Sequence, residues 1–167
     1  MTTTTPTTST TPNTPTTAPT PGTAPTTNGR VIALAHYAAR ALLEGVLTRH
    51  GATFHHSVTL RYVVISGGSV GHDALVREVV GSLKVDASVV RDVIEELTAT
   101  QLLETDPAEA SLLRLTKAGR ELHDVTSAET AKISARLYAD IPPEDLAVTG
   151  RVLTLLTERA NAELSAA

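Results

Sequence analysis

The side chains best suited to recognition chemistry are arginines and lysines in and around the segment KVDASVVRDVIEEL, residues 84–97. Arg91 is the best candidate for direct base readout, because a guanidinium can bind guanine through two parallel hydrogen bonds. The alternative is an exposed arginine that pairs with Glu95 at four-residue spacing on a helix. The full set of candidate DNA contacts is Arg77, Lys84, Ala87, Ser88, Arg91, Arg114 and Lys117. For the other charged members, ordinary surface charge is the alternative.

Histidines form a second group, with His50, His55 and His56 close together in the sequence. Histidine binds zinc, but zinc sites usually draw on cysteines or on histidines at fixed spacing. The chain has no cysteine and no His-x-x-x-His pair, so no metal site is expected. These histidines are either surface and core residues or anion-pairing groups in a pocket.

The sequence gives little support for catalysis. The sequence contains no nucleophile elbow, no glycine-rich phosphate loop and no metal-ligand spacing. We therefore expect a protein that is not an enzyme and needs no cofactor.

Composition limits the class of protein further. A length of 167 residues suits one domain. The net charge of -4 disfavours protein-wide attraction to nucleic acid or anionic lipid, so DNA binding would need a local basic patch. With no cysteine, no secretory signal and no apolar run of about 20 residues, the expected location is the cytoplasm, away from membranes.

Residues 1–29 form a Thr/Pro-rich tail that contains six of the nine prolines. Such a segment buries too little apolar surface to offset its loss of conformational entropy, so we expect it to be disordered. An O-glycosylated stalk is the alternative, and the lack of a signal peptide disfavours it.

From residue 30 onward the sequence predicts a mainly helical domain. Apolar residues at helical spacing predict a helix over 30–50, with Asn28 as its cap and Gly51 at its end. Residues 57–66 are ambiguous, because their β-branched residues favour a strand while their spacing also fits a helix. Residues 72–83 predict another helix.

A helix-turn-helix candidate follows, because the helix after KVD is separated from 72–83 by only a short connection. Asp86 or Ser88 can cap this helix, whose expected buried stripe is Val89, Val93, Ile94 and Leu97. LLE and LLRLT, separated by TDPAEAS, predict a small β-hairpin wing. Two long helices complete the chain, over 117–138 and from IPPEDL onward, where proline fits the first turn.

This order of elements resembles the MarR family of winged helix-turn-helix transcription regulators. The segment DASVVRDVIEELTATQLLETDP resembles the family's recognition helix and the strand after it. LRLTKAGREL is similar to the sequence that follows the wing, and IPPEDLAVTGRVLTLLTERANAEL to the closing helix. The resemblance covers nearly everything from residue 30 onward and implies that the ambiguous segment is the second helix.

The resemblance also implies an assembly and a ligand. It implies a homodimer held mainly by residues 30–66 and 117–167, with 67–116 as the winged helix-turn-helix that binds double-stranded DNA. It further implies a small aromatic or anionic effector, for which His36, His55 and Tyr62 are the candidate pocket residues.

The sequence departs from this family in its charge. The wing tip, DPAEAS, carries no basic residue, which removes phosphate contacts and the counterion release that accompanies them. Residues 72–104 carry three basic and seven acidic side chains. If Val89, Val93 and Leu97 face inward, the acidic residues of this helix lie beyond its base-contacting end. The alternative function is therefore a ligand-binding or protein-interaction module of the same fold with weakened or lost DNA binding.

Overall fold

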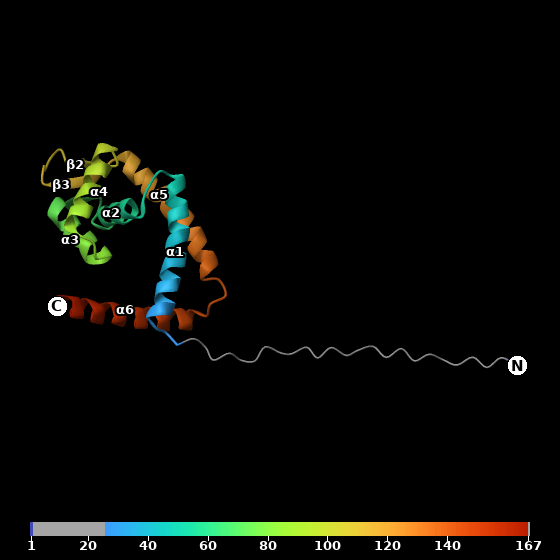
Figure 1. Cartoon of the computed structure of the whole chain (residues 1–167). Coiled ribbons are helices and arrows are strands. Elements are labelled where there is room, and N and C mark those ends of the chain that lie inside the picture. Colours follow the sequence, from blue (N-terminus) through green and yellow to red (C-terminus); the bar gives the residue numbers. More distant parts are fainter. Residues whose placement is uncertain (2–25, 167) are drawn as a thin grey trace.

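The computed structural model describes residue 1 and residues 26–166 (Figure 1). The predicted disordered tail at 1–29 lies mostly outside the described residues. The elements, in chain order, are α1 (Gly29–Arg49), α2 (Phe54–Ile65), β1 (Ser69–Gly71), α3 (His72–Leu83), α4 (Ala87–Ala99), β2 (Leu103–Thr105), β3 (Leu112–Leu115), α5 (Lys117–Leu137) and α6 (Pro143–Ala166).

Capping explains where the first two helices begin. The Asn28 side chain accepts a hydrogen bond from the Val31 amide, as predicted. Thr53 caps α2, and the imidazole of His56 accepts the Thr53 amide in return, which completes a capping box. The ambiguous segment is therefore a helix, despite its β-branched residues.

The wing is part of a three-stranded antiparallel sheet in the order β1-β3-β2. The hairpin of β2 and β3 pairs Leu103 with Leu115 and Glu104 with Arg114. The hairpin prediction is confirmed, while β1, which pairs Val70 with Leu113, was not anticipated. The predicted class, mainly α with a small β wing, is confirmed.

The main hydrophobic core lies within the winged lobe. Leu60 and Val63 of α2 join Leu75 of α3, Leu97 of α4 and Leu103 of β2 in one buried cluster. Although α2 was expected among the dimerisation helices, it gives its buried face to this lobe. The lobe is therefore a packed unit that holds α3, α4 and the sheet in fixed positions.

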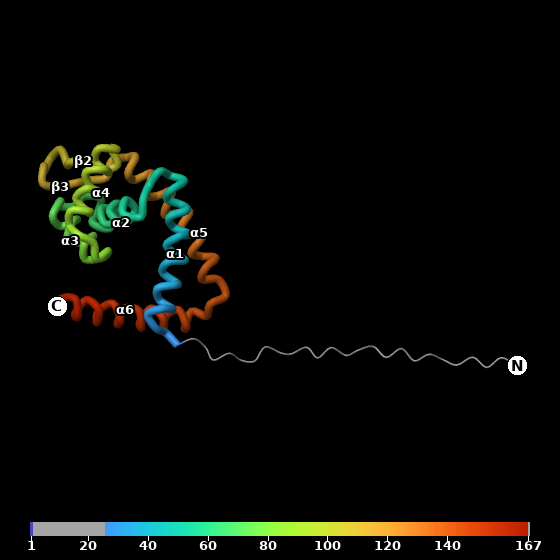
Figure 2. Tube along the Cα trace, in the orientation of Figure 1, coloured from blue at the N-terminus to red at the C-terminus, as the bar shows by residue number. Residues whose placement is uncertain are grey.

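The remaining helices form a second region. The trace shows α1 and α5 side by side, with α5 running from the wing toward the far end of α1 (Figure 2). α6 then leads away from them and buries none of its residues. This region exposes a great deal of apolar surface, including Leu34 and Tyr37 of α1 and Leu164 of α6.

Candidate nucleic-acid interface and ligand cavity

The turn between α3 and α4 sets the start of the candidate recognition helix. Lys84 ends α3 in the left-handed conformation, with φ of 56°, and its amide donates to the Val80 carbonyl. α4 begins at Ala87 after Asp86, whose side chain makes no capping hydrogen bond. The first-turn amides of α4 are thus left free of a side-chain cap.

The buried stripe of α4 differs from the predicted one. The structure buries Val90, Val93, Ile94 and Leu97, whereas Val89 is 38% exposed. The prediction of Val89 was wrong because either of two adjacent valines fits the sequence periodicity. At about 100° per residue, the shift turns Ser88, Asp92 and Glu95 to the side opposite the core.

This shift affects the electrostatics of the outward face. Asp92 and Glu95 are exposed and lie there with Ser88, so the acidic residues do not all lie beyond the N-terminal half of the helix. Carboxylates in a major groove face repulsion from both phosphate chains, although they can accept from cytosine amino groups. Arg91 is exposed at one edge of this face, and no ion pair with Glu95 occurs among the described residues.

The other candidate DNA contacts differ in availability. Arg77 and Ser88 are exposed, and Ala87 is half-buried. Lys84 donates through Nζ to the Gly81 carbonyl at 2.6 Å, and Lys117 Nζ lies 3.6 Å from Glu121. The Arg114 guanidinium is held at 2.8 Å by Glu104 on the neighbouring strand. Arg114 is therefore already neutralised by a partner within the sheet.

The wing tip is organised by its acidic residues. Asp106 accepts the Ala108 amide at 2.8 Å, and Glu109 accepts the Ser111 hydroxyl at 2.8 Å. These contacts stabilise a compact turn that presents carboxylates. The tip offers no cation to a phosphate, as its sequence predicted.

A cavity of about 400 Å³ lies between α1, α2 and α5. Two smaller cavities of about 330 and 350 Å³ share lining residues with it, and Leu43 lines all three. Arg61 lines both the 400 Å³ and the 330 Å³ cavity. The larger cavity is lined by Leu43, Ser57, Arg61, Val64, Ile65, His123, Thr126, Ser127, Thr130, Ala131 and Ser134.

The three predicted pocket residues are not brought together. Tyr62 lines the 330 Å³ cavity and His36 the 350 Å³ cavity. His55 lines none of these three cavities, and its ring lies 6.1 Å from that of Phe54. The sequence did not predict that Arg61 and His123 line a cavity. The serines and threonines of α5 could have indicated a cavity, because they interrupt the apolar residues along one side of this long helix.

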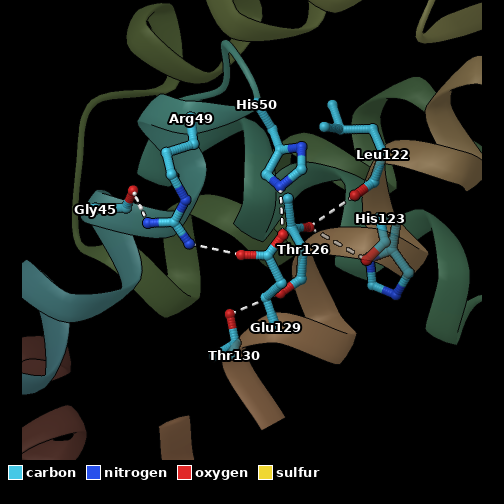
Figure 3. Close-up of polar contacts among 8 residues, drawn as sticks. All are labelled: Gly45, Arg49, His50, Leu122, His123, Thr126, Glu129 and Thr130. Atoms are coloured by element: carbon cyan, nitrogen blue, oxygen red, sulfur yellow. Dashed lines mark hydrogen bonds and ion pairs between the residues drawn. The ribbon is translucent and has the colours of Figure 1, made fainter. Parts of the chain in front are cut away.

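A polar network joins the end of α1 to α5 beside this cavity (Figure 3). Glu129 receives the Arg49 guanidinium at 2.6 Å and contacts His50 Nε2 at 2.7 Å. The hydrogen bond to His50, followed by that to Arg49, lowers the pKa of the Glu129 carboxyl. The neighbouring α5 residues in Figure 3, His123, Thr126 and Thr130, line the cavity.

No cluster of three or more His, Cys, Asp or Glu side chains able to hold a metal ion is found among residues 26–166. His56 Nε2 instead lies 3.0 Å from Glu96 of α4. The sequence cluster of histidines is thus divided between contacts to α4, to α5 and to Phe54.

Comparison with solved structures identifies the architecture. CouR from Rhodococcus jostii RHA1, bound to p-coumaroyl-CoA, is similar with a TM-score of 0.66 and 19% identity over 77% of this chain and 90% of its own. A MarR-family transcriptional regulator from Rhodococcus sp. RHA1 is similar as well, with a TM-score of 0.64 and 18% identity over 77% of this chain and 91% of its own. The chain has the MarR-family fold. The MarR resemblance inferred from the sequence is confirmed at the level of the fold.

Other MarR structures match over a similar share of the chain. Bordetella bronchiseptica BpsR, whose DNA binding is regulated by 6-hydroxynicotinic acid, has a TM-score of 0.61 and 23% identity over 77% of this chain and 97% of its own. A mutant E. coli MarR complexed with operator DNA has a TM-score of 0.62 and 16% identity over 77% and 91%. No protein-family model and no curated protein matches the sequence.

Proposed function

We propose that the protein is a dimeric transcription regulator that binds double-stranded DNA through α4 and responds to a small molecule. The observation that carries this proposal is the winged helix-turn-helix itself, with α4 seated on the lobe core and its outer face exposed. Helix-turn-helix proteins place such a helix in the major groove, with its N-terminal residues at the base edges. The similar structures are those of transcription regulators, which supports a role other than catalysis.

The dimer is proposed from unpartnered apolar surface. α6 buries none of its residues within one chain, yet it carries a long series of leucines and valines. Exposed apolar patches of this extent mark association surfaces. A second copy of the chain would cover α1 and α6 together and place two winged lobes side by side.

α1 is also long and apolar enough to cross a membrane, although its sequence holds no uninterrupted apolar run of that length. However, Arg40 and Glu44 form an ion pair at 2.8 Å in its second half. Charged residues within a membrane are costly, so a dimer interface accounts better for this apolar helix than a bilayer does. We therefore propose a cytoplasmic protein.

A ligand-responsive role is supported by the cavities between α1, α2 and α5. They lie where the winged lobe meets the other long helices, so a ligand there would contact both regions. A ligand that binds one relative orientation of these regions better than another shifts the population toward it.

The acidic outer face of α4 favours a second candidate function. Asp92 and Glu95 on that face, the Arg114–Glu104 pair and the acidic wing tip all reduce attraction to phosphate. A protein with this surface would act as a ligand-binding or protein-interaction module with weak DNA affinity.

Fluorescence anisotropy with DNA flanking the protein's own gene, at two salt concentrations, separates the two functions. Under the DNA-binding proposal, Arg91→Ala weakens operator binding by about tenfold and non-specific binding much less, because one base contact is worth about 1–3 kcal/mol. Equal losses on both DNAs would restrict Arg91 to a phosphate contact. Absence of sequence-selective binding at low salt would leave the second function.

A further inference from the structure

The 400 Å³ cavity has an unusual hydroxyl lining on α5. Thr126, Ser127, Thr130 and Ser134 line it from one face of that helix, and Ser57 lines it from α2. Helix faces that pack against neighbouring helices are normally apolar, because a polar group costs free energy when it is buried without a partner. Here the hydroxyl face lies against a space large enough for a small metabolite.

The threonine hydroxyls of this face are available as hydrogen-bond acceptors. Thr130 Oγ1 donates to the Thr126 carbonyl at 2.7 Å, and Thr126 Oγ1 donates to the Leu122 carbonyl at 2.8 Å. A hydroxyl has one proton to donate and two lone pairs that accept. With the proton committed to the helix backbone, the remaining capacity of each threonine favours a ligand that donates, such as an alcohol.

Arg61, in contrast, is a hydrogen-bond donor and favours a ligand group that accepts. Within residues 26–166, its guanidinium makes no ion pair and no side-chain hydrogen bond. No Asp or Glu lines either of the two cavities that Arg61 borders. Arg61 is exposed, so its guanidinium is available to bind a planar carboxylate or a phosphate through two parallel hydrogen bonds.

Aromatic stacking has little place in the larger cavity. Its lining includes one aromatic ring, the imidazole of His123, and no Phe or Tyr, whereas Phe54 and Tyr62 line the 330 Å³ cavity, which Arg61 also borders. A flat aromatic acid would be bound better in that smaller cavity. The larger one suits a flexible ligand that carries hydroxyl groups.

We propose that the 400 Å³ cavity binds a small hydroxylated organic anion, with its charged group on Arg61 and its hydroxyl groups on the α5 face. This inference rests on the proposed ligand-responsive function and names the chemical class of the ligand. The anion is a carboxylate or a phosphate, and the two sources are separated by the choice of probes.

Isothermal titration calorimetry on the full chain, without DNA, tests the proposal. The probes are D-gluconate, D-glucose 6-phosphate, neutral sorbitol and benzoate. Gluconate or glucose 6-phosphate should bind at least about tenfold more tightly than sorbitol, because the charged hydrogen bonds to Arg61 are missing in the neutral polyol. Benzoate should also bind more weakly, since it has no hydroxyl group to donate to the threonines.

Three variants locate the ligand. Arg61→Gln should weaken binding of the preferred anion by about tenfold or more, while Arg136→Gln, on α5 but outside the cavity lining, serves as the matched control. Thr130→Val keeps the side-chain shape, removes the acceptor and should reduce the preference for the hydroxylated anion over benzoate. Tyr62→Leu, in the smaller cavity, should leave binding unchanged.

Several results would overturn the inference. These are tighter binding of benzoate than of either hydroxylated anion, no binding by any probe at millimolar concentration, and wild-type affinity in Arg61→Gln. A loss in Tyr62→Leu with none in Thr130→Val would place the ligand in the smaller cavity and also overturn it. Operator binding without ligand binding would leave the proposed DNA-binding function intact, whereas ligand binding without operator binding would remove only that function.

Discussion

Gly119 shows how one residue fixes the junction between the wing and α5. A Cβ atom added at this position would overlap the Leu102 carbonyl oxygen and lie 3.1 Å from Leu115 Cδ2. Only glycine lets the first turn of α5 approach the backbone at the start of the hairpin so closely. Thr116 reinforces the junction by capping α5 and donating to the Gln101 carbonyl at 2.6 Å.

Gly119→Ala should therefore lower the free energy of unfolding by about 1–3 kcal/mol, the usual cost of overpacking a fixed site. Urea denaturation followed by circular dichroism measures it. Gly81→Ala is the matched control, because a Cβ there meets nothing within 4 Å and removal of a helical glycine should stabilise by about 0.5–1 kcal/mol. Equal effects of the two substitutions would contradict the close approach at Gly119.

Lys84 and Gln101 both have φ of 56°, in the left-handed region that favours glycine. The sequence did not predict these left-handed residues on either side of α4. Lys84 makes a local contact to the Gly81 carbonyl, and nothing in the structure explains the choice of Gln101.

At the scale of elements, α4 carries the surface on which the proposed DNA binding depends. Its outer face combines Ser88 with Asp92 and Glu95, while Arg91 lies at the edge. In a DNA groove, the two carboxylates would be repelled by the phosphates on either side. The attraction of one arginine to the same phosphates would not offset that repulsion. The electrostatic balance of this single helix face thus separates the two proposed functions.

Replacing Asp92 with Asn and Glu95 with Gln should strengthen binding to non-specific DNA several-fold at low salt, because two repulsive charges are removed while the shapes are kept. The gain should shrink as salt rises, since screening weakens these interactions. Anisotropy titrations at two salt concentrations measure both effects. Asp145→Asn, at the start of α6, is the control, and an equal gain in that variant would show that only net charge matters.

The contact between α1 and α5 is a second feature at this scale. Glu129 is ionised while it accepts from Arg49 and His50, and these partners hold its pKa below the ordinary glutamate value. A lowered pKa in the folded state stabilises the protein above the unfolded-state pKa. That contribution is lost as pH falls through the folded pKa.

Glu129→Gln should accordingly lower the free energy of unfolding at neutral pH. The variant should also lose less stability than the wild type as the pH falls below roughly 4.3, the ordinary glutamate pKa. Thermal unfolding measured across an acidic pH series provides the comparison. Glu78→Gln, an exposed residue on α3, should keep the wild-type profile. A Glu129→Gln profile that parallels the wild type throughout would show that the contact contributes no acid-sensitive stability.

Sequence periodicity predicted most elements because helix spacing and capping residues are local signals. The register of α4 was missed because Val89 and Val90 are both apolar, and only packing against α2 and α3 selects Val90. The cavity was missed for another reason. Leu43, Arg61 and Thr130 come from three separate helices, and serines and threonines on a long helix resemble a solvated face until the fold places Arg61 opposite them.

At the scale of the whole molecule, α6 is the element that the single chain does not explain. Val148, Val152 and Leu156 fall along one side of it at about 100° per residue, and all remain exposed. Leu153 and Leu164 extend the apolar surface around the helix. So wide an apolar surface, on a helix that buries none of its residues, marks a surface for association with another molecule.

The dimer proposal predicts that Leu156→Glu shifts the protein toward monomer and lowers its melting temperature, because a charge would have to be desolvated in the interface. Sedimentation equilibrium measures the association, and the wild-type melting temperature should rise with protein concentration. Thr154→Glu, on the opposite side of α6, is the matched control and should remain dimeric. A wild-type chain that sediments as a monomer at micromolar concentration would contradict the dimer, and α6 would then need a different partner to cover it.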